Sequence, residues 1–90
     1  IEEPTVVIEN IPYYREQVMV MGENKDSSKF NHNGVEYVKF KDSDYIQEMT
    51  AYERGYITVY GSIKQNTWAG RTTPQILIQD YIIEDATYDF

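Results

Sequence analysis

The sequence contains no cysteine, so no disulfide can staple the fold and no thiolate can bind zinc. That absence fits a reducing compartment, and we expect a cytoplasmic protein. No apolar run approaches the roughly 18 residues that span a membrane, so we expect no membrane partner. The first four residues lack the basic and apolar segments of a signal peptide and start without methionine, which predicts a piece of a longer polypeptide.

Basic residues are scarce, with 8 against 15 acidic ones and a net charge of -7. A field of that sign repels phosphates and disfavours a dedicated nucleic-acid-binding protein, so any contact with DNA has to be local or helped by a basic neighbouring domain. Tyrosine, by contrast, is abundant at 9 of 90 residues, and it favours strands and wet sheet faces.

Residues for catalysis and metal binding are also few. Nucleophilic catalysis needs an activated side chain beside a base, and the single histidine, His32, is expected to be an exposed turn residue. Neither an EF-hand loop nor a Walker-type phosphate loop is found. The only candidates for metal ligands are carboxylates that lie near one another in the sequence, namely Asp42 with Asp44 and Asp80 with Glu84 and Asp85. We therefore expect no catalytic residue, no metal site and no cofactor in this chain.

Short β-prone runs alternate with turn signals along the chain. The strongest signal is Asn33-Gly34, which predicts a hairpin because both central residues must adopt positive φ. A short helix is expected over residues 45–52, capped by Ser43 or Asp44 and ended by Gly55 in the left-handed conformation. Gly61 predicts a bulge or a sharp bend within a strand. The expected strands are 17–22, 29–32, 35–40, 56–63 and 75–83, with a β-prone lead-in at 5–8 that ends at an edge-type proline, Pro12, and a polar loop at 65–74.

This order places a short helix between the third and fourth of five strands, which predicts an all-β, five-stranded Greek-key barrel of the OB type. We expect one domain over residues 1–90, with the barrel over about 5–84 and a frayed acidic tail over 85–90. Alternation along the strands predicts a core of Val18, Val20, Phe30, Val38, Phe40, Ile57, Val59, Ile63, Ile76 and Ile78.

Residues 57–81 resemble the end of the OB domain of bacterial RecJ single-stranded-DNA-specific exonucleases. In that family a segment of the form N-x-W-x-G-R-x-x-x-Q, followed by alternating apolar residues and an aspartate, joins the last two strands. The matching residues are Asn66, Trp68, Gly70, Arg71, Gln75 and Asp80. The runs Val20-Met21-Gly22 and Lys29-Phe30 also resemble the family's first two strands, so the resemblance covers about residues 8–83.

The resemblance implies a parent enzyme of DNA repair and recombination that degrades single-stranded DNA from its 5′ end. Such a hydrolase uses Mg or Mn held by DHH-type Asp/His motifs, and none of these motifs is in this sequence. The domain would then hold or guide single-stranded DNA, weakly on its own, beside the catalytic domains of the same chain.

The residues that would bind the strand are Trp68, Arg71, Tyr37, Lys39, Lys41, Lys29 and Lys25. Trp68 can stack on a base or cover a mouth of the barrel, and Arg71 can hold a phosphate or pair with Asp80. Tyr37, Lys39 and Lys41 form an aromatic and basic stripe on one strand face, which alternation alone would also produce as a solvated wall.

A second hypothesis stays open. In it the domain is a structural or protein-interaction module that never grips DNA. Its tyrosine-rich wall, with Tyr56 and Tyr60, would pack on the catalytic core or on a partner. Net charge favours this alternative, while the composition of the 65–74 loop favours DNA.

Overall fold

The computed structural model describes residues 5–87, apart from the side chains of Asn66 and Trp68. It contains β1 (Thr5–Tyr14), the 3-10 turn η1 (Arg15–Gln17), β2 (Met19–Met21), β3 (Ser27–His32), β4 (Val35–Lys39), α1 (Ser43–Ala51), β5 (Arg54–Trp68) and β6 (Arg71–Asp85). No helix in this part of the chain is long and apolar enough to cross a membrane.

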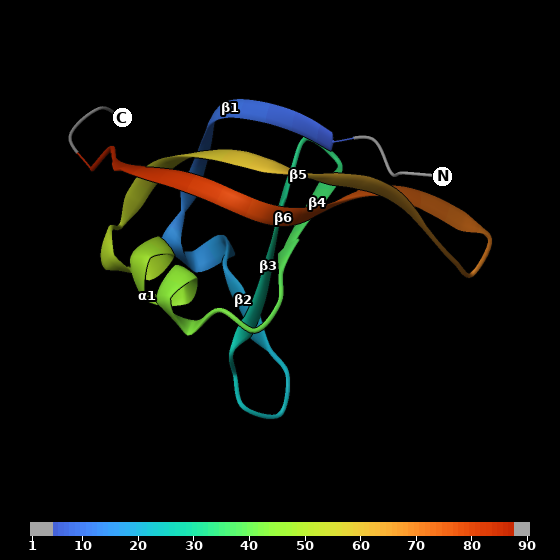
Figure 1. The fold of residues 1–90 in the computed structure, drawn as a ribbon, viewed down its shortest axis with the longest axis horizontal. Helices are drawn as coiled ribbons and strands as arrows, with labels where there is room; N and C mark the ends of the chain where they lie inside the picture. Colours follow the sequence, from blue (N-terminus) through green and yellow to red (C-terminus); the bar gives the residue numbers. More distant parts are fainter. Residues whose placement is uncertain (1–4, 88–90) are drawn as a thin grey trace.

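The strands form a single sheet with the order β1-β5-β6-β4-β3-β2, in which β4 and β6 pair in parallel and the other neighbours are antiparallel. β1 and β2 lie at opposite ends of this order, yet only η1 and Val18 separate them in the chain. They therefore act as one interrupted strand that brings the two ends of the sheet together (Figure 1). Counted this way the barrel has the five strands of an OB fold, as predicted, although six separate strands are observed.

The N-terminal lead-in is longer than expected. β1 pairs with β5 from Thr5↔Ser62 to Tyr14↔Arg54, and a register shift at Asn10, whose φ is 53°, separates its two halves. Pro12 is tolerated because β1 is an edge strand of the sheet. A missing N–H on its outer side costs no hydrogen bond to a neighbouring strand. Because η1 takes up residues 15–17, the strand expected at 17–22 is reduced to the three residues of β2.

The helix cap lies one position before Ser43 and two before Asp44, so neither predicted cap is correct. Asp42 is the N-cap, and its Oδ1 accepts a hydrogen bond of 3.0 Å from the backbone N–H of Tyr45. At the other end the helix stops at Ala51 and the chain turns into extended backbone at Tyr52. The expected left-handed cap at Gly55 is wrong, since Gly55 lies in β5 and is buried.

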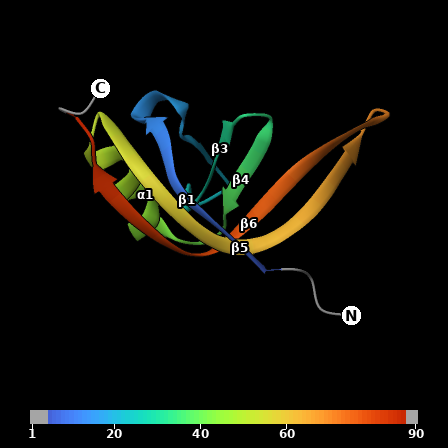
Figure 2. The ribbon, with the colours of Figure 1, turned by 90° about the horizontal axis from the view of Figure 1, so that it is seen from above.

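Gly55 is required for a different reason. A Cβ at this position would lie 2.8 Å from Cε1 of Tyr13, so the buried ring occupies the space of a side chain. Gly61 does mark a bulge, as predicted, because the register between β5 and β6 shifts between Tyr60 and Gly61. Figure 2 shows both strands bending strongly, with α1 near one end of the bend.

The polar loop expected over residues 65–74 is wrong. β5 and β6 continue pairing to Trp68↔Arg71, and a two-residue turn at Ala69-Gly70, with φ of 51° and 80°, joins them. Beyond Ser62 and Gln75 these strands pair only with each other, which makes residues 64–74 a two-stranded projection, hereafter the arm. It leaves the barrel on the side away from α1 (Figures 1 and 2).

The tail is more ordered than predicted. β6 continues to Asp85, and Ala86 is buried, with its N–H donating to the Arg54 carbonyl at 3.1 Å. The prediction that the tail frays from residue 85 is therefore wrong for Asp85 and Ala86. Residues 88–90 of the predicted tail lie outside the described residues.

Most of the predicted core is confirmed. Six of its residues are buried, namely Phe30, Val38, Ile57, Val59, Ile76 and Ile78, and Val18 packs against them partly buried. Three predictions are wrong, because Val20, Phe40 and Ile63 are 45%, 55% and 39% exposed. Ile63 shares a face with buried Ile76 but stands where the arm leaves the barrel, so nothing covers it from the other side.

Tyrosines fill much of the space left by those aliphatic residues. The core also contains Ile11, Tyr13, Tyr37, Tyr45, Met49 and Ala86. The hydroxyl of Tyr13 donates to the Met49 carbonyl at 2.9 Å, which satisfies its polar end and ties β1 to α1.

Candidate nucleic-acid interface

The outer face of the barrel wall can be followed through the strand register. Lys29 pairs with Val38, and Val38 pairs with Leu77, so the three side chains form one row across β3, β4 and β6. The neighbouring position on β4, Tyr37, faces the core. Because successive side chains alternate between faces, the row of Lys29 lies on the face opposite to that of Tyr37, where Lys29 and Leu77 are half-buried and Val38 is buried.

A second outer row continues onto the arm. It runs from Asn31 through Glu36 and Gln75 to Lys64, and Gln75 Nε2 donates to Glu36 Oε1 at 2.9 Å. Arg71 lies four positions before Gln75 along β6, so it shares this face. Its side chain is exposed at the tip of the arm. The fold therefore brings Lys29, Lys64 and Arg71 to one face from three strands.

Charge is distributed unevenly between this side and the rest of the chain. Residues 19–41 and 64–77, called here the interface segments, hold β2, the β2–β3 loop, β3, β4 and the arm. They carry six basic residues and three acidic ones, a balance of +3, while the remainder carries two and 12, a balance of -10. The sum is the net charge of -7. The loops joining strands 1–2 and 4–5 of an OB barrel are its usual ligand-binding loops, and here they correspond to the β2–β3 loop and the tip of the arm.

Tyr37 is misplaced by the sequence prediction. Its side chain is 3% exposed and its ring stacks on Phe30, with centroids 4.9 Å apart and an interplanar angle of 13°. Burial raises the pKa of its hydroxyl above the ordinary value. A ring in this position supports the barrel and has no face open to a base, so the predicted stripe does not exist as a surface.

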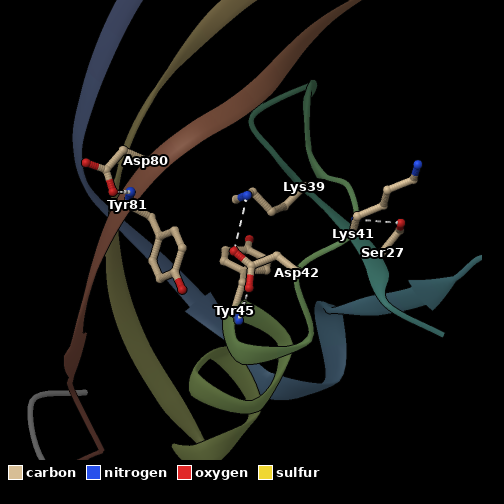
Figure 3. A network of polar contacts seen from close by, with 7 residues as sticks. All are labelled: Ser27, Lys39, Lys41, Asp42, Tyr45, Asp80 and Tyr81. Carbon is tan, nitrogen blue, oxygen red and sulfur yellow. Dashed lines mark hydrogen bonds and ion pairs between the residues drawn. The ribbon is translucent and has the colours of Figure 1, made fainter. Parts of the chain in front are cut away.

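Lys39 shares the inward face of Tyr37 and is tied to the helix cap. Its Nζ lies 3.2 Å from Oδ2 of Asp42 (Figure 3). Partial burial alone would raise the pKa of Asp42, but the hydrogen bonds from Tyr45 and Lys39 outweigh it and lower that pKa. Lys39 thus holds α1 to the end of β4.

Lys41 and Lys25 are exposed on turns with φ of 54° each. The backbone N–H of Lys41 donates to Ser27 Oγ at 3.1 Å, and its side chain points away from that contact (Figure 3). The N–H of Lys25 donates to the Gly22 carbonyl at 3.2 Å. Both backbones are therefore anchored while the ammonium groups face solvent beside β3.

The two residues expected in the 65–74 loop lie on the arm. The prediction for Trp68 concerns a side chain outside the described residues, although its backbone pairs with Arg71 at the tip. The structure does not support the alternative pairing of Arg71 with Asp80, because the two residues lie nine positions apart along one strand, a path of about 30 Å. Asp80 Oδ1 instead accepts from the N–H of Tyr81 at 2.8 Å (Figure 3).

Sequence reasoning missed an exposed aromatic residue beside this surface. Phe40 was assigned to the core, but it follows the last residue of β4 and is 55% exposed, next to Lys41. Met19, paired with Lys29, is 56% exposed. The sequence does place Phe40 directly before a polar turn. At that point no neighbouring strand pairs with the chain, so alternation no longer predicts which way the side chain faces.

Within residues 5–87, no three His, Cys, Asp or Glu side chains come close enough to hold a metal ion. His32 lies at the hairpin turn and is half-buried, with its ring Nε2 3.1 Å from Nδ2 of Asn33. The surface therefore offers cations, amides and apolar side chains, the groups that contact phosphates and bases.

Comparison with known proteins gives a consistent result. The family described as RecJ OB domain matches residues 1–80. Two curated relatives are each 37% identical over 83 residues. One is an SPbeta prophage-derived protein of Bacillus subtilis (strain 168), and the other is from Bacillus phage SPbeta. Both carry the name of a single-strand DNA-specific exonuclease, YorK. The matched region is 89% of this chain and 14% of each relative, so the chain spans about one seventh of their length.

Proposed function

The chain belongs to the RecJ OB domain family, and on that premise we propose that it guides single-stranded DNA for an exonuclease of which it is one domain. The parent enzyme would cut DNA at a separate catalytic core, with Mg or Mn, in cytoplasmic DNA repair and recombination. The observation that carries the DNA-guiding role is the concentration of cations on the interface segments: apart from Lys39, which is paired with Asp42, five basic residues stand there against three acidic ones, while the rest of the chain is strongly acidic.

Local charge can outweigh the net charge for a flexible strand. At physiological ionic strength, interactions between exposed charges are largely screened beyond about 8 Å. A phosphate near Lys29 or Arg71 therefore responds mainly to the interface segments and only weakly to carboxylates on the far side of the barrel. This reconciles the repulsive net charge with weak, local binding.

The path we propose follows the outer face from the β2–β3 loop to the arm. Lys25, Lys41 and Lys29 contact phosphates beside β3, and Arg71 and Lys64 contact them along the arm. Phe40 takes the stacking role that the sequence suggested for Tyr37, and Trp68 provides a second aromatic residue at the tip. Lys39 acts indirectly, by holding α1 against β4 through Asp42.

Titration of an unstructured fluorescent oligonucleotide tests this path. We expect a Kd of about 10⁻⁵ M or weaker, with a log–log salt slope of about -1.4 to -2.1 for two or three phosphate contacts. Arg71→Ala should weaken binding and flatten the slope by about 0.7. Arg15→Ala is the matched control, since Arg15 is also exposed but lies on η1 outside the interface segments. If Arg71→Ala and Arg15→Ala weaken binding equally, the binding is non-specific charge attraction and the proposed path is wrong.

The aromatic contacts are tested separately. Phe40→Ala and Trp68→Ala should each weaken binding by about 1–3 kcal/mol if their rings stack on bases. Tyr14→Ala is the control, because Tyr14 is 44% exposed on β1, outside the interface segments. If both substitutions and Arg71→Ala leave binding in the parent enzyme unchanged, the DNA-guiding role is refuted.

A further inference from the structure

A second surface of the barrel is apolar although it faces outward. It is the outer face of β1, β5 and β6, and it is called here the tyrosine wall: Val7, Tyr56, Thr58, Tyr60 and Ile82. Val7 and Ile82 are each 52% exposed, and the other three are half-buried. The wall lies across the barrel from β2, β3 and the β2–β3 loop (Figure 1).

The strand register makes these side chains neighbours. Val7 pairs with Tyr60, Thr58 pairs with Ile82, and Tyr56 stands one step further along the same face of β5. Thr58 Oγ1 already accepts the N–H of Asn10 at 3.2 Å, so its hydroxyl is engaged at the β1 bulge. Water alone favours polar residues on an outward strand face, yet here two aliphatic side chains, Val7 and Ile82, are each 52% exposed beside Tyr56 and Tyr60. Contiguous exposed apolar side chains of this kind mark an interaction surface.

Carboxylates border the wall. Asp80 pairs with Tyr60 in the register and Glu84 pairs with Tyr56, while Glu9 follows Val7 on the outward parity of β1. All three are exposed. Phosphates are repelled here, which disfavours nucleic acid. A second copy of the same face would oppose carboxylate to carboxylate, which disfavours a symmetric dimer through this wall.

We propose that the tyrosine wall is the docking surface for another domain of the same polypeptide, one that presents an apolar centre with a basic rim. The inference rests on the proposed function, in which this chain is one part of a longer exonuclease. The matched region is only 14% of each relative's length, so most of such a polypeptide lies outside this domain. Docking through this wall leaves the interface segments open, and the domain then holds DNA on one side and its own enzyme on the other.

Hydroxyl-radical footprinting of the full-length parent protein tests the docking. Val7 and Ile82 should be labelled several-fold more slowly than Val20, which is 45% exposed on β2. The comparison of Val7 with Val20 is matched in residue type and nearly matched in exposure within the domain. Equal labelling of the three residues would overturn the proposal.

Two further measurements identify the occupant. Protection of the wall that disappears on dilution would assign it to a second copy, and protection that requires added oligonucleotide would assign it to DNA; either overturns the proposal. Ile82→Asp should restore fast labelling of Val7 in the full-length protein, whereas Val20→Asp should leave Val7 protected. The Arg71→Ala binding test is independent of these results, so loss of docking and loss of DNA guiding are told apart.

Discussion

Tyr37 and Phe30 stack inside the barrel, with their ring centroids 4.9 Å apart and their planes 13° from parallel. They pair directly across β3 and β4, so the contact joins the two strands of the Asn33-Gly34 hairpin. An offset stack of this kind contributes about 0.5–1.5 kcal/mol beyond the burial of its apolar area.

Replacing Tyr37 should therefore affect stability before it affects DNA. Tyr37→Ala should lower the free energy of unfolding by about 3–5 kcal/mol, because it leaves a ring-sized cavity in the core. Phe40→Ala should change it by about 0.5 kcal/mol or less, since that ring is 55% exposed. Urea unfolding of both variants measures the difference. Equal, small effects would place Tyr37 on the surface after all.

The link between Asp42 and Lys39 predicts a dependence on pH. The folded-state pKa of Asp42 is lowered from its ordinary value of 3.8, so the stabilisation is complete above that value and is lost as the pH falls through the folded pKa. Asp42→Asn keeps a capping oxygen but loses the charge. The wild-type protein should be more stable than this variant at pH 7, and the gap should close below about pH 4. A gap that widens in acid would contradict the assignment.

Gly61 is predicted to be far less tolerant than Gly70. An added Cβ at Gly61 would collide with the backbone carbonyl of Leu77, whereas nothing lies within 4 Å of one at Gly70. Gly61→Ala should cost about 3 kcal/mol, since backbone must move to admit it. Gly70→Ala should cost about 1–2 kcal/mol, from its φ of 80° alone. Thermal unfolding of both variants gives the ranking, and a reversed order would show that the bulge adapts easily.

The isolated domain should have no nuclease activity with magnesium or manganese. Metal-dependent hydrolysis needs a convergent set of ligands, and in the described part of the chain no such set exists. Incubation with labelled single-stranded DNA and either metal measures this directly. Cutting that disappears on substitution of Asp80 or Asp85 would overturn the prediction.

Local patterns predicted the elements that depend on neighbouring residues. Asn33-Gly34 forms the hairpin turn, with φ of 52° and 80°, and Gly61 marks the bulge. The order of strands and helix along the chain was enough to predict the OB barrel. The segment around Arg71 was enough to predict the family. The same reasoning treated residues 65–74 as a loop, because polar residues on a two-stranded arm exposed on both faces look the same in sequence as a loop.

The sequence by itself determined the Asn33-Gly34 turn, the order of the elements along the chain and the family, because each depends on residues close together in the chain. Which face of β4 points inward was decided only by the tertiary structure. Val38 and Tyr37 are both buried, so alternation had no polar side to identify, and the outcome follows from contacts with distant strands. Tyr37 meets Phe30 in the core, Val38 is buried between Lys29 and Leu77 on the opposite face of β4, and Phe40 stands beyond the last pairing of β4. Those long-range contacts therefore decide that Phe40, and not Tyr37, is exposed beside the proposed DNA path.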